Sequence, residues 1–149
     1  MQNDTMIRPM RFDDIDIVYK MERKLFPNPW PKVFFERDLE APETVALIAE
    51  YEGRIVGYAI SRCVDVKKLH ITNIAVNEKY QRRGIATRLM INLERIAGER
   101  GCNYAYLEVR TNNDAAIDFY KRIGYDVSHI HKQYYIYGDD AYVMQKKLR

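Results

Sequence analysis

The sequence predicts an α/β protein built on one mixed β-sheet with helices on both faces. A strand, a helix and a second strand follow one another between Leu69 and Val109, and such a unit implies two parallel strands joined by a crossover helix. The strand-like runs Thr44–Tyr51 and Arg54–Val64 are separated only by Glu52-Gly53, a connection typical of an antiparallel hairpin. Parallel and antiparallel neighbours together indicate a mixed sheet.

The N-terminal part is predicted to form one strand and two helices. Met6–Met10 is a short candidate strand. From Ile15 to Phe26, apolar residues and Glu22 recur at the spacing of a helix. The prolines of the segment Pro27–Pro31 end this helix, because each lacks an amide donor and restricts the residue before it. Pro31 then opens a second short helix that runs through Leu39.

The C-terminal part is predicted to alternate strands and helices. Apolar residues from Ile85 onward trace one helical face, and Gly101 and Gly124 stand where helices are expected to end. The predicted elements after the hairpin are the strand Leu69–Val76, a helix from Ile85, the strand Tyr104–Val109, the helix Asp114–Ile123, and the antiparallel strands Tyr125–Tyr134 and Ala141–Leu148. The whole chain therefore predicts seven strands and four helices.

Length and composition favour a single cytoplasmic domain that spans residues 1–149. A chain of 149 residues with 47% hydrophobic residues can form one sizeable core and is short for two. The net charge of +3 comes from scattered Lys and Arg without a basic stripe, which argues against nucleic-acid binding. The polar start Met1–Thr5 has no apolar targeting segment, and no apolar run is long enough to span a membrane. Cys63 and Cys102 lack metal-ligand spacing, so we expect core thiols and no metal site.

The segment Gln81-Arg82-Arg83-Gly84-Ile85-Ala86 joins a predicted strand to a predicted helix. At such a junction the first free backbone N–H groups of the helix converge on whatever lies above the turn, and a diphosphate fits there. Gly84 lets the backbone come close, and the two arginines add positive charge. Taken alone, the segment also fits a tight turn relieved by glycine with solvated arginines.

Two longer segments decide between these interpretations. Asn73-Ile74-Ala75-Val76 before the turn and Leu107–Tyr120 after it complete a pattern that resembles the GNAT superfamily of N-acetyltransferases. The resemblance covers nearly the whole chain and is nearest to the branch of RimI and the NatA catalytic subunit, which acetylates protein N-termini. Ala86 stands where glycine is commoner in the family. The resemblance implies the GNAT fold, in which the fourth and fifth strands splay apart to admit the pantetheine arm of acetyl-CoA.

The resemblance also implies acetyl-CoA as the cosubstrate and assigns the residues that hold it. The turn would bind the pyrophosphate, the fourth strand and Asn113 the pantetheine arm, and Tyr120 would point its hydroxyl at the thioester sulfur as a general acid. The expected cofactor-binding residues are Ile74, Ala75, Val76, Gln81, Arg82, Arg83, Gly84, Ile85, Ala86, Thr87, Asn113 and Tyr120.

The chemistry of amide formation suggests two candidate bases. A free α-amine with a pKa near ~8 is on the order of one-tenth neutral at pH 7, against roughly one in a few thousand for lysine, so modest help suffices. Glu108, acting through a water, is the first candidate, and pairing with an arginine is its structural alternative. His70 is the second, because strand alternation is expected to put it on the same face as Ile74 and Val76. The backbone N–H of Val76 is the expected oxyanion donor.

The acceptor site is expected to lie between two segments. Tyr134-Tyr135, followed by Gly138-Asp139-Asp140-Ala141-Tyr142, resembles the NatA segment whose paired tyrosines grip the first peptide bonds of the substrate. The loop Phe26–Pro31 would form the facing wall, and its Pro29-Trp30 pair is more similar to RimI than to NatA, which usually has a glutamate near Asn28. The expected substrate-binding residues are Phe26, Pro27, Asn28, Trp30, Tyr134 and Tyr135.

The predicted function is therefore the transfer of an acetyl group from acetyl-CoA to the α-amine of a protein N-terminus, on a ribosomal protein or a nascent chain. The protein is expected to act as a monomer or weak dimer. Two alternatives stay open at this point. One is an acetyltransferase for small amines, and the other is an acyl-CoA-binding sensor without catalytic activity.

Overall fold

The fold is described by a computed structural model that covers residues 4–65, 67–135 and 138–148. Seven strands form one sheet in the order β1-β2-β3-β4-β5-β7-β6. The elements are β1 (Thr5–Pro9), α1 (Ile15–Leu25), α2 (Lys32–Glu40), β2 (Thr44–Tyr51), β3 (Arg54–Val64), β4 (Lys68–Val76), α3 (Ile85–Glu99), β5 (Tyr104–Arg110), α4 (Asp114–Arg122), β6 (Asp126–His131) and β7 (Ala141–Lys147), with short 3-10 turns at Phe12–Asp14 and Glu78–Tyr80. The predicted order and number of strands and helices are confirmed, although β6 ends three residues earlier than expected, at His131 instead of Tyr134.

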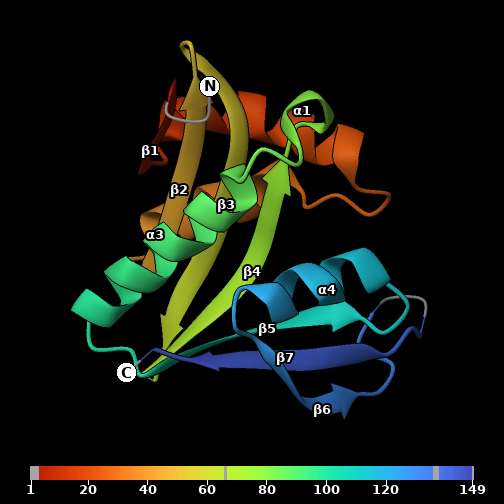
Figure 1. Cartoon of the computed structure of the whole chain (residues 1–149). Coiled ribbons are helices and arrows are strands. Elements are labelled where there is room, and N and C mark those ends of the chain that lie inside the picture. The colour runs from red at the N-terminus through yellow and green to blue at the C-terminus, as the bar shows by residue number, and fades with distance from the viewer. Residues whose placement is uncertain (1–3, 66, 136–137, 149) are drawn as a thin grey trace.

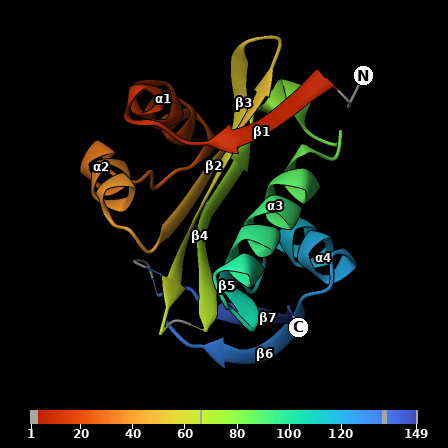
Figure 2. The same cartoon turned by 90° about the vertical axis from the view of Figure 1, so that its left-hand side faces the viewer.

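The helices cover both faces of the sheet, as predicted. Figure 2 shows α1 and α2 on one face and α3 and α4 on the other. Each face has its own core: Leu89 and Leu93 of α3 belong to one cluster of buried residues, and Val18 of α1 and Phe35 of α2 belong to the other. Among the helices that the structure describes, none combines the length and the apolar character of a membrane span.

The sheet opens between β4 and β5, its parallel neighbours. Only three residue pairs join them, Lys68↔Tyr104, Leu69↔Ala105 and His70↔Tyr106, and the strands then diverge (Figure 1). We call this opening the fork. The splay implied by the family resemblance is therefore confirmed.

A β-bulge in β4 lies directly beyond the last of these pairs. Ile60 of β3 faces Asn73, whereas the next residue, Ser61, faces Ile71, so Thr72 is an extra residue in β4. A bulge of this kind bends its strand and increases the local twist. The bend carries the end of β4 away from β5.

The bulge also reverses the faces of β4. Leu69, Ile71 and Val76 all contact the core on the α3 side, although their spacing would place Val76 opposite the other two in a regular strand. His70 therefore faces the α1 side, the side on which Ala75 is buried. The expectation that His70 shares a face with Ile74 and Val76 is wrong, because Thr72 interrupts the alternation.

Candidate active site

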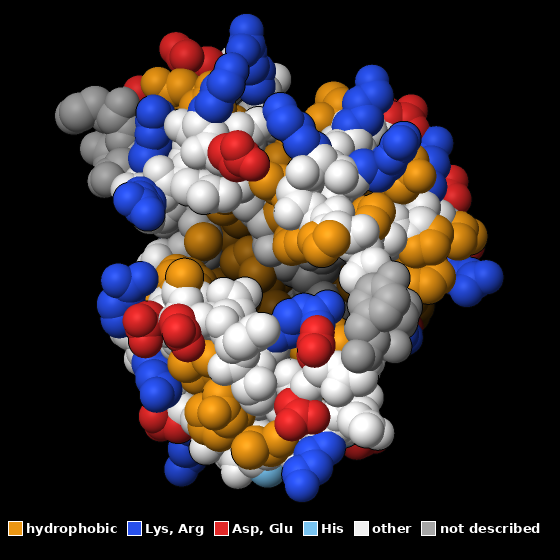
Figure 3. All heavy atoms as spheres, turned by 90° about the vertical axis from the view of Figure 1, so that its right-hand side faces the viewer, with side chains coloured by type: hydrophobic (Ala, Val, Ile, Leu, Met, Phe, Trp, Pro, Cys, Tyr) orange, Lys and Arg blue, Asp and Glu red, His pale blue; other side chains and the backbone are white. Residues whose placement is uncertain are grey.

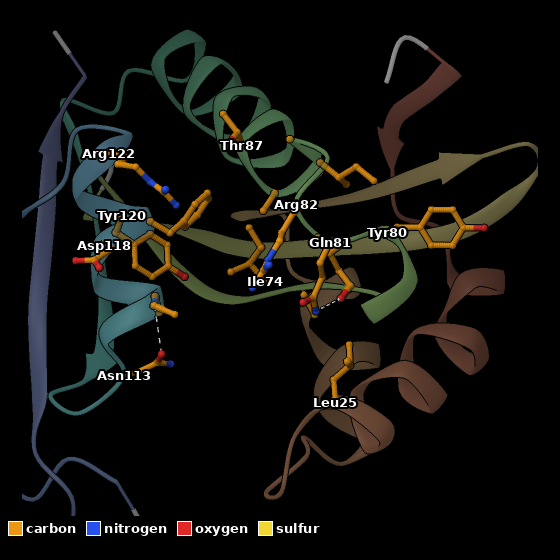
Figure 4. Close-up of a pocket in the computed structure, with 18 of the residues that line it drawn as sticks. Leu25, Ile74, Tyr80, Gln81, Arg82, Thr87, Asn113, Asp118, Tyr120 and Arg122 are labelled. Atoms are coloured by element: carbon orange, nitrogen blue, oxygen red, sulfur yellow. Dashed lines mark hydrogen bonds between the residues drawn. The ribbon is translucent and has the colours of Figure 1, made fainter. Parts of the chain in front are cut away.

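A cleft of about 940 Å³ passes through the fork. Figure 3 shows it as a hollow with a hydrophobic floor. Figure 4 shows Asn113, the N-cap of α4, and Tyr120 of α4 on one side and Leu25 and Gln81 on the other. The cleft is lined by Leu25, Phe26, Ile74, Ala75, Val76, Tyr80, Gln81, Arg82, Gly84, Ile85, Ala86, Thr87, Asn113, Ala115, Ala116, Asp118, Phe119, Tyr120 and Arg122. It joins the two faces of the sheet, since Leu25 belongs to α1 and Tyr120 to α4.

The turn before α3 has the geometry of an anion site. Arg82 and Gly84 both have positive φ, at 64° and 81°, and Gly84 is the N-cap of α3. A Cβ on Gly84 would meet no atom within 4 Å, so the backbone conformation, not lack of space, favours glycine there. The first turn of α3 contains no acidic residue, and its residues Ile85, Ala86 and Thr87 line the cleft. An anion in the cleft therefore meets free helix amides and the Arg82 side chain.

Arg83 takes a different position from its neighbour. Its guanidinium lies over the ring of Tyr80, 5.1 Å from the ring centroid, and Arg83 is not among the residues that line the cleft. Arg82 is thus the arginine of the turn that borders the cleft. A direct contact between Arg83 and the cofactor stays a prediction.

Every second residue of β4 points its backbone N–H and C=O groups toward the fork. The Asn77 N–H donates to the Val56 carbonyl at 2.8 Å, so Asn77 faces β3 and the preceding residue, Val76, faces the fork. The Val76 carbonyl accepts a hydrogen bond from Nε2 of Gln81 at 2.9 Å, as this orientation requires. By the same alternation, Ile74 also directs its backbone groups toward the fork.

Tyr120 lines the cleft and carries a hydroxyl group that is protonated at neutral pH. Its ring packs edge-on against the rings of Phe119 and Tyr125, with centroids 5.2 Å and 6.1 Å away, and these contacts fix its orientation. Burial, with a smaller effect from Tyr135, raises the pKa of Tyr120 to about 12. The hydroxyl therefore keeps its proton at neutral pH.

Asn113 caps α4 and borders the cleft. Its Oδ1 accepts a hydrogen bond from the Ala116 N–H at 3.2 Å. Because the oxygen is used by the cap, the amide nitrogen is the group that Asn113 can offer to a ligand.

Glu108 and His70 form a pair where the fork begins. Nε2 of His70 lies 2.7 Å from Oε1 of Glu108, and the His70 ring stacks on Tyr106 with centroids 4.4 Å apart. Burial, and after it the charge of the nearby Glu108 carboxylate, raises the pKa of Tyr134 to about 12. The neighbours of Glu108 in β5, Leu107 and Val109, face the α3 side, so the pair faces the α1 side.

The hydrogen-bond partner of Glu108 among the described residues is thus a histidine, and not an arginine as the structural alternative for Glu108 expected. Arg110 forms an ion pair with Asp139 and lies over the ring of Tyr135, 4.0 Å from its centroid. Tyr134 and Tyr135 pack edge to face, with centroids 5.0 Å apart. The two candidate bases and the tyrosine pair are therefore brought together.

The loop Phe26–Pro31 meets the predicted site only in part. Phe26 lines the cleft, whereas Pro27 and Asn28 are exposed and do not line it. The Trp30 ring packs on α2, with centroids 5.9 Å from Phe34 and 5.4 Å from Phe35. Roles for Pro27, Asn28 and Trp30 in acceptor binding stay predictions.

Several cleft residues lack a clear signal in the sequence. Leu25 and Phe119 lie on apolar helical faces and read as core residues, and Tyr80 lies in a short 3-10 turn. Arg122 is one of many scattered basic residues. Glu22, which is buried outside the cleft lining, did have a signal in the sequence, because a glutamate on an otherwise apolar helical face is rarely buried without a partner.

The fold and the cleft together define a class of protein. A sheet split between two parallel strands, a basic turn with free helix amides at its opening and a protonated tyrosine at the cleft suit a transferase that draws on an extended, phosphate-bearing acyl donor. The residues fit acetyl-CoA: the turn matches its pyrophosphate, and the exposed backbone of β4 matches its amide-containing arm.

Comparison with known proteins identifies the family. A family model described as acetyltransferase (GNAT) family matches residues 15–125. The chain is 34% identical over 154 residues to an N-alpha-acetyltransferase of Sulfurisphaera tokodaii, with 95% of this chain and 92% of the relative covered. It is 38% identical over 133 residues to the N-alpha-acetyltransferase RimI of Mycobacterium tuberculosis, with 85% and 82% covered. The chain belongs to the GNAT family and is an acetyl-CoA-dependent N-acetyltransferase.

Solved structures agree with this assignment. The ribosomal-protein-S18-alanine N-acetyltransferase of Escherichia coli superposes with a TM-score of 0.88 at 27% identity, with 97% of this chain and 94% of that chain covered. Ard1 of Thermoplasma volcanium gives a TM-score of 0.90 at 25% identity, with 97% of each chain covered. The resemblance inferred from the sequence motifs is confirmed.

Proposed function

We propose that this N-acetyltransferase modifies the α-amine of protein N-termini. The similarity to relatives named N-alpha-acetyltransferase supports this acceptor class. The observation that carries the proposal is the Glu108 carboxylate at the beginning of the fork, hydrogen-bonded to His70 and near Tyr134. This cluster lies on the α1 side of the sheet, opposite the anion-binding turn and α4, so acceptor and donor can approach each other through the fork.

The residues of the cleft divide the binding of acetyl-CoA among them. Acetyl-CoA, when bound, supplies the thioester carbonyl that the amine attacks. The amides at the start of α3 and the Arg82 side chain would hold its pyrophosphate. The fork-facing backbone of Ile74 and Val76 would pair with the pantetheine arm, and the amide nitrogen of Asn113 can donate to it.

Proton transfer would be divided between two residues on opposite faces. Glu108, oriented by its hydrogen bond to His70, accepts the proton of the amine directly or through a water. Tyr120 gives its hydroxyl proton to the departing thiolate, and its raised pKa keeps that proton available at neutral pH. The Val76 N–H faces the fork and would stabilise the oxyanion, a contribution on the order of 3 kcal/mol for one donor.

The acceptor surface is also consistent with a polypeptide. Tyr134 and Tyr135 present two rings edge to face, and Arg110 lies over the second ring, so this wall is aromatic and includes a cation. A polyamine would favour an acidic wall. Ribosomal proteins and nascent chains are the proposed partners, and the cytoplasmic location and the monomeric or weakly dimeric state stay predictions from the sequence.

A peptide array tests this proposal. The protein and acetyl-CoA are incubated with peptides that carry all residues in turn at positions one and two, alongside spermidine and the same peptides with blocked α-amines. We expect acetylation of a subset of free N-termini and none of the blocked peptides. Acetylation of spermidine alone would support the small-amine enzyme, and binding of acetyl-CoA without transfer to any acceptor would support the sensor.

A further inference from the structure

Glu22 is a buried carboxylate that the chemistry described above does not use. It lies in α1, its exposed fraction is 2%, and its carboxylate accepts three hydrogen bonds. Oε1 accepts from the Tyr58 hydroxyl at 2.7 Å and from Nδ2 of Asn73 at 2.9 Å, and Oε2 accepts from the backbone N–H of Trp30 at 3.1 Å. One oxygen is thus bonded to the sheet and the other to the loop Phe26–Pro31.

All three donors are neutral groups. The other buried carboxylate, Asp14, forms an ion pair with Arg8 at 2.8 Å, whereas no described Lys, Arg or His forms an ion pair with Glu22. A buried carboxylate without a cation is costly unless its oxygens are well hydrogen-bonded. Such a carboxylate can hold its donors strongly, because hydrogen bonds to a charged acceptor are roughly twice as strong as neutral ones.

The loop depends on this contact because it has few other backbone donors. Three of the five residues from Pro27 to Pro31 are prolines, which leaves only the N–H groups of Asn28 and Trp30. The Trp30 N–H donates to Glu22. Phe26, at the start of the loop, lines the cleft.

On the sheet side, Glu22 contacts β4 through Asn73. Asn73 follows the bulged residue Thr72 and precedes Ile74, whose backbone faces the fork. Glu22 therefore joins the loop to β4 at the point where β4 bends away from β5.

We propose that Glu22 is a positioning residue that holds the loop Phe26–Pro31 against β4 and thereby sets the affinity for the acceptor peptide. This inference rests on the proposed function, since it assigns the loop to the acceptor side of the site. It predicts that loss of the contact weakens acceptor binding and leaves acetyl-CoA binding and the chemical step unchanged.

The variant Glu22→Gln separates the two sides of the contact. Glutamine keeps the size of the side chain and one acceptor oxygen, which can stay with Tyr58 and Asn73, whereas its amide nitrogen cannot accept from the Trp30 N–H. The matched control is Tyr58→Phe, which removes a hydrogen bond from the same carboxylate and leaves the Trp30 contact in place. Both variants are expected to lower the melting temperature.

The first readout is steady-state kinetics with a peptide that begins with alanine. We expect Glu22→Gln to raise the KM for this peptide about tenfold, the loss expected for one charge-assisted hydrogen bond, with kcat and the KM for acetyl-CoA within about twofold of the wild type. Tyr58→Phe is expected to keep the wild-type peptide KM. An unchanged peptide KM in Glu22→Gln, or an equal rise in both variants, would overturn the proposal.

The second readout does not depend on activity. Trp30 is the only tryptophan of the sequence, so fluorescence that is excited at wavelengths where the 12 tyrosines do not absorb reports on the loop alone. We expect acrylamide to quench Trp30 more strongly in Glu22→Gln than in the wild type and equally in Tyr58→Phe and the wild type. Equal quenching in all three proteins would refute the loop contact. A wild-type protein that acetylates no peptide would instead refute the proposed function, and the quenching result would still decide whether Glu22 holds the loop.

Discussion

The Nε2 atom of His70 lies 2.7 Å from Oε1 of Glu108, across the last residue pairs that join β4 to β5. Neither side chain is freely exposed, at 23% for His70 and 13% for Glu108. The two strands supply one group each and then part. The sheet thus brings the candidate base and its partner together where the fork begins, the place at which we propose that the acceptor amine approaches.

Glu108→Gln is expected to lower kcat by about 10²-fold, because the amide cannot accept the proton of the amine. The KM for acetyl-CoA should stay near the wild-type value, since Glu108 is not among the residues that line the cleft. Steady-state kinetics with varied acetyl-CoA checks both statements. The control is Glu50→Gln, which changes a glutamate of β2 that forms an ion pair with Arg8 of β1. It should leave kcat unchanged. Full activity of Glu108→Gln would remove this residue from the mechanism.

His70 and Glu108 are expected to act as one unit. If His70 works by orienting the carboxylate, His70→Asn lowers kcat, and the double variant with Glu108→Gln is little worse than Glu108→Gln alone. A double-mutant cycle on kcat measures this coupling. Additive losses would show that the two residues act separately.

Tyr120→Phe is expected to slow the chemical step by about 10²-fold, because the proton for the thiolate is lost. Binding of acetyl-CoA, measured by calorimetry, should change little. The control Tyr125→Phe removes the hydroxyl of a neighbouring buried tyrosine that donates to Glu94, away from the cleft. Equal losses of binding and rate in Tyr120→Phe would indicate a packing role.

The raised pKa of Tyr120 also affects stability at high pH. Its value is about 12 in the folded protein against 10.0 for an unperturbed tyrosine, so the folded state holds more protons between these values. The contribution of Tyr120 to the free energy of unfolding is therefore fully present below pH 10 and is lost as the pH rises from 10 to about 12. Tyr120→Phe should show a shallower decrease in this range by urea unfolding at a series of pH values. Parallel curves for variant and wild type would contradict the assigned shift.

Gly57→Ala in β3 is expected to displace the end of β4 that borders the fork. A Cβ on Gly57 would lie 3.0 Å from the Ala75 carbonyl and 3.4 Å from Cγ2 of Val76, so β4 must shift at two residues that line the cleft. We expect a loss on the order of 1–3 kcal/mol in stability and a several-fold higher KM for acetyl-CoA. The control Gly98→Ala, near the end of α3 with no atom within 4 Å of its Cβ, should keep the KM and not lower stability. An unchanged KM in Gly57→Ala would mean that β4 tolerates the added methyl group.

Most of the fold could be predicted because the sequence features that specify its helices, strands and turns lie within short segments. Hydrophobic periodicity, the Glu52-Gly53 turn and the glycines after α3 and α4 predict the elements and their order. The bulge at Thr72 has no such signal, since it arises from the fit of β4 against β3, and it reverses the face of every residue beyond it. The predicted position of His70 relative to Ile74 failed for this reason.

The site was less predictable than the fold because it depends on contacts between distant segments. The turn Gln81–Ala86 could be predicted as an anion site from its six residues and their surroundings, because the signal is local. The Glu108–His70 contact joins residues 38 positions apart, and Glu22 meets Asn73 across 51 positions. Side-chain partners over such separations follow from the packed sheet and not from spacing along the chain.

Acetylation of the α-amines of polypeptides is the proposed activity of this protein. The most direct measurement uses a peptide that begins with alanine and contains one internal lysine, incubated with the protein and acetyl-CoA and then sequenced by tandem mass spectrometry. We expect one acetyl group on the alanine α-amine and an unmodified lysine, with the product strongly reduced in Glu108→Gln. Acetylation of the lysine alone, or the same product yield with Glu108→Gln, would contradict the account.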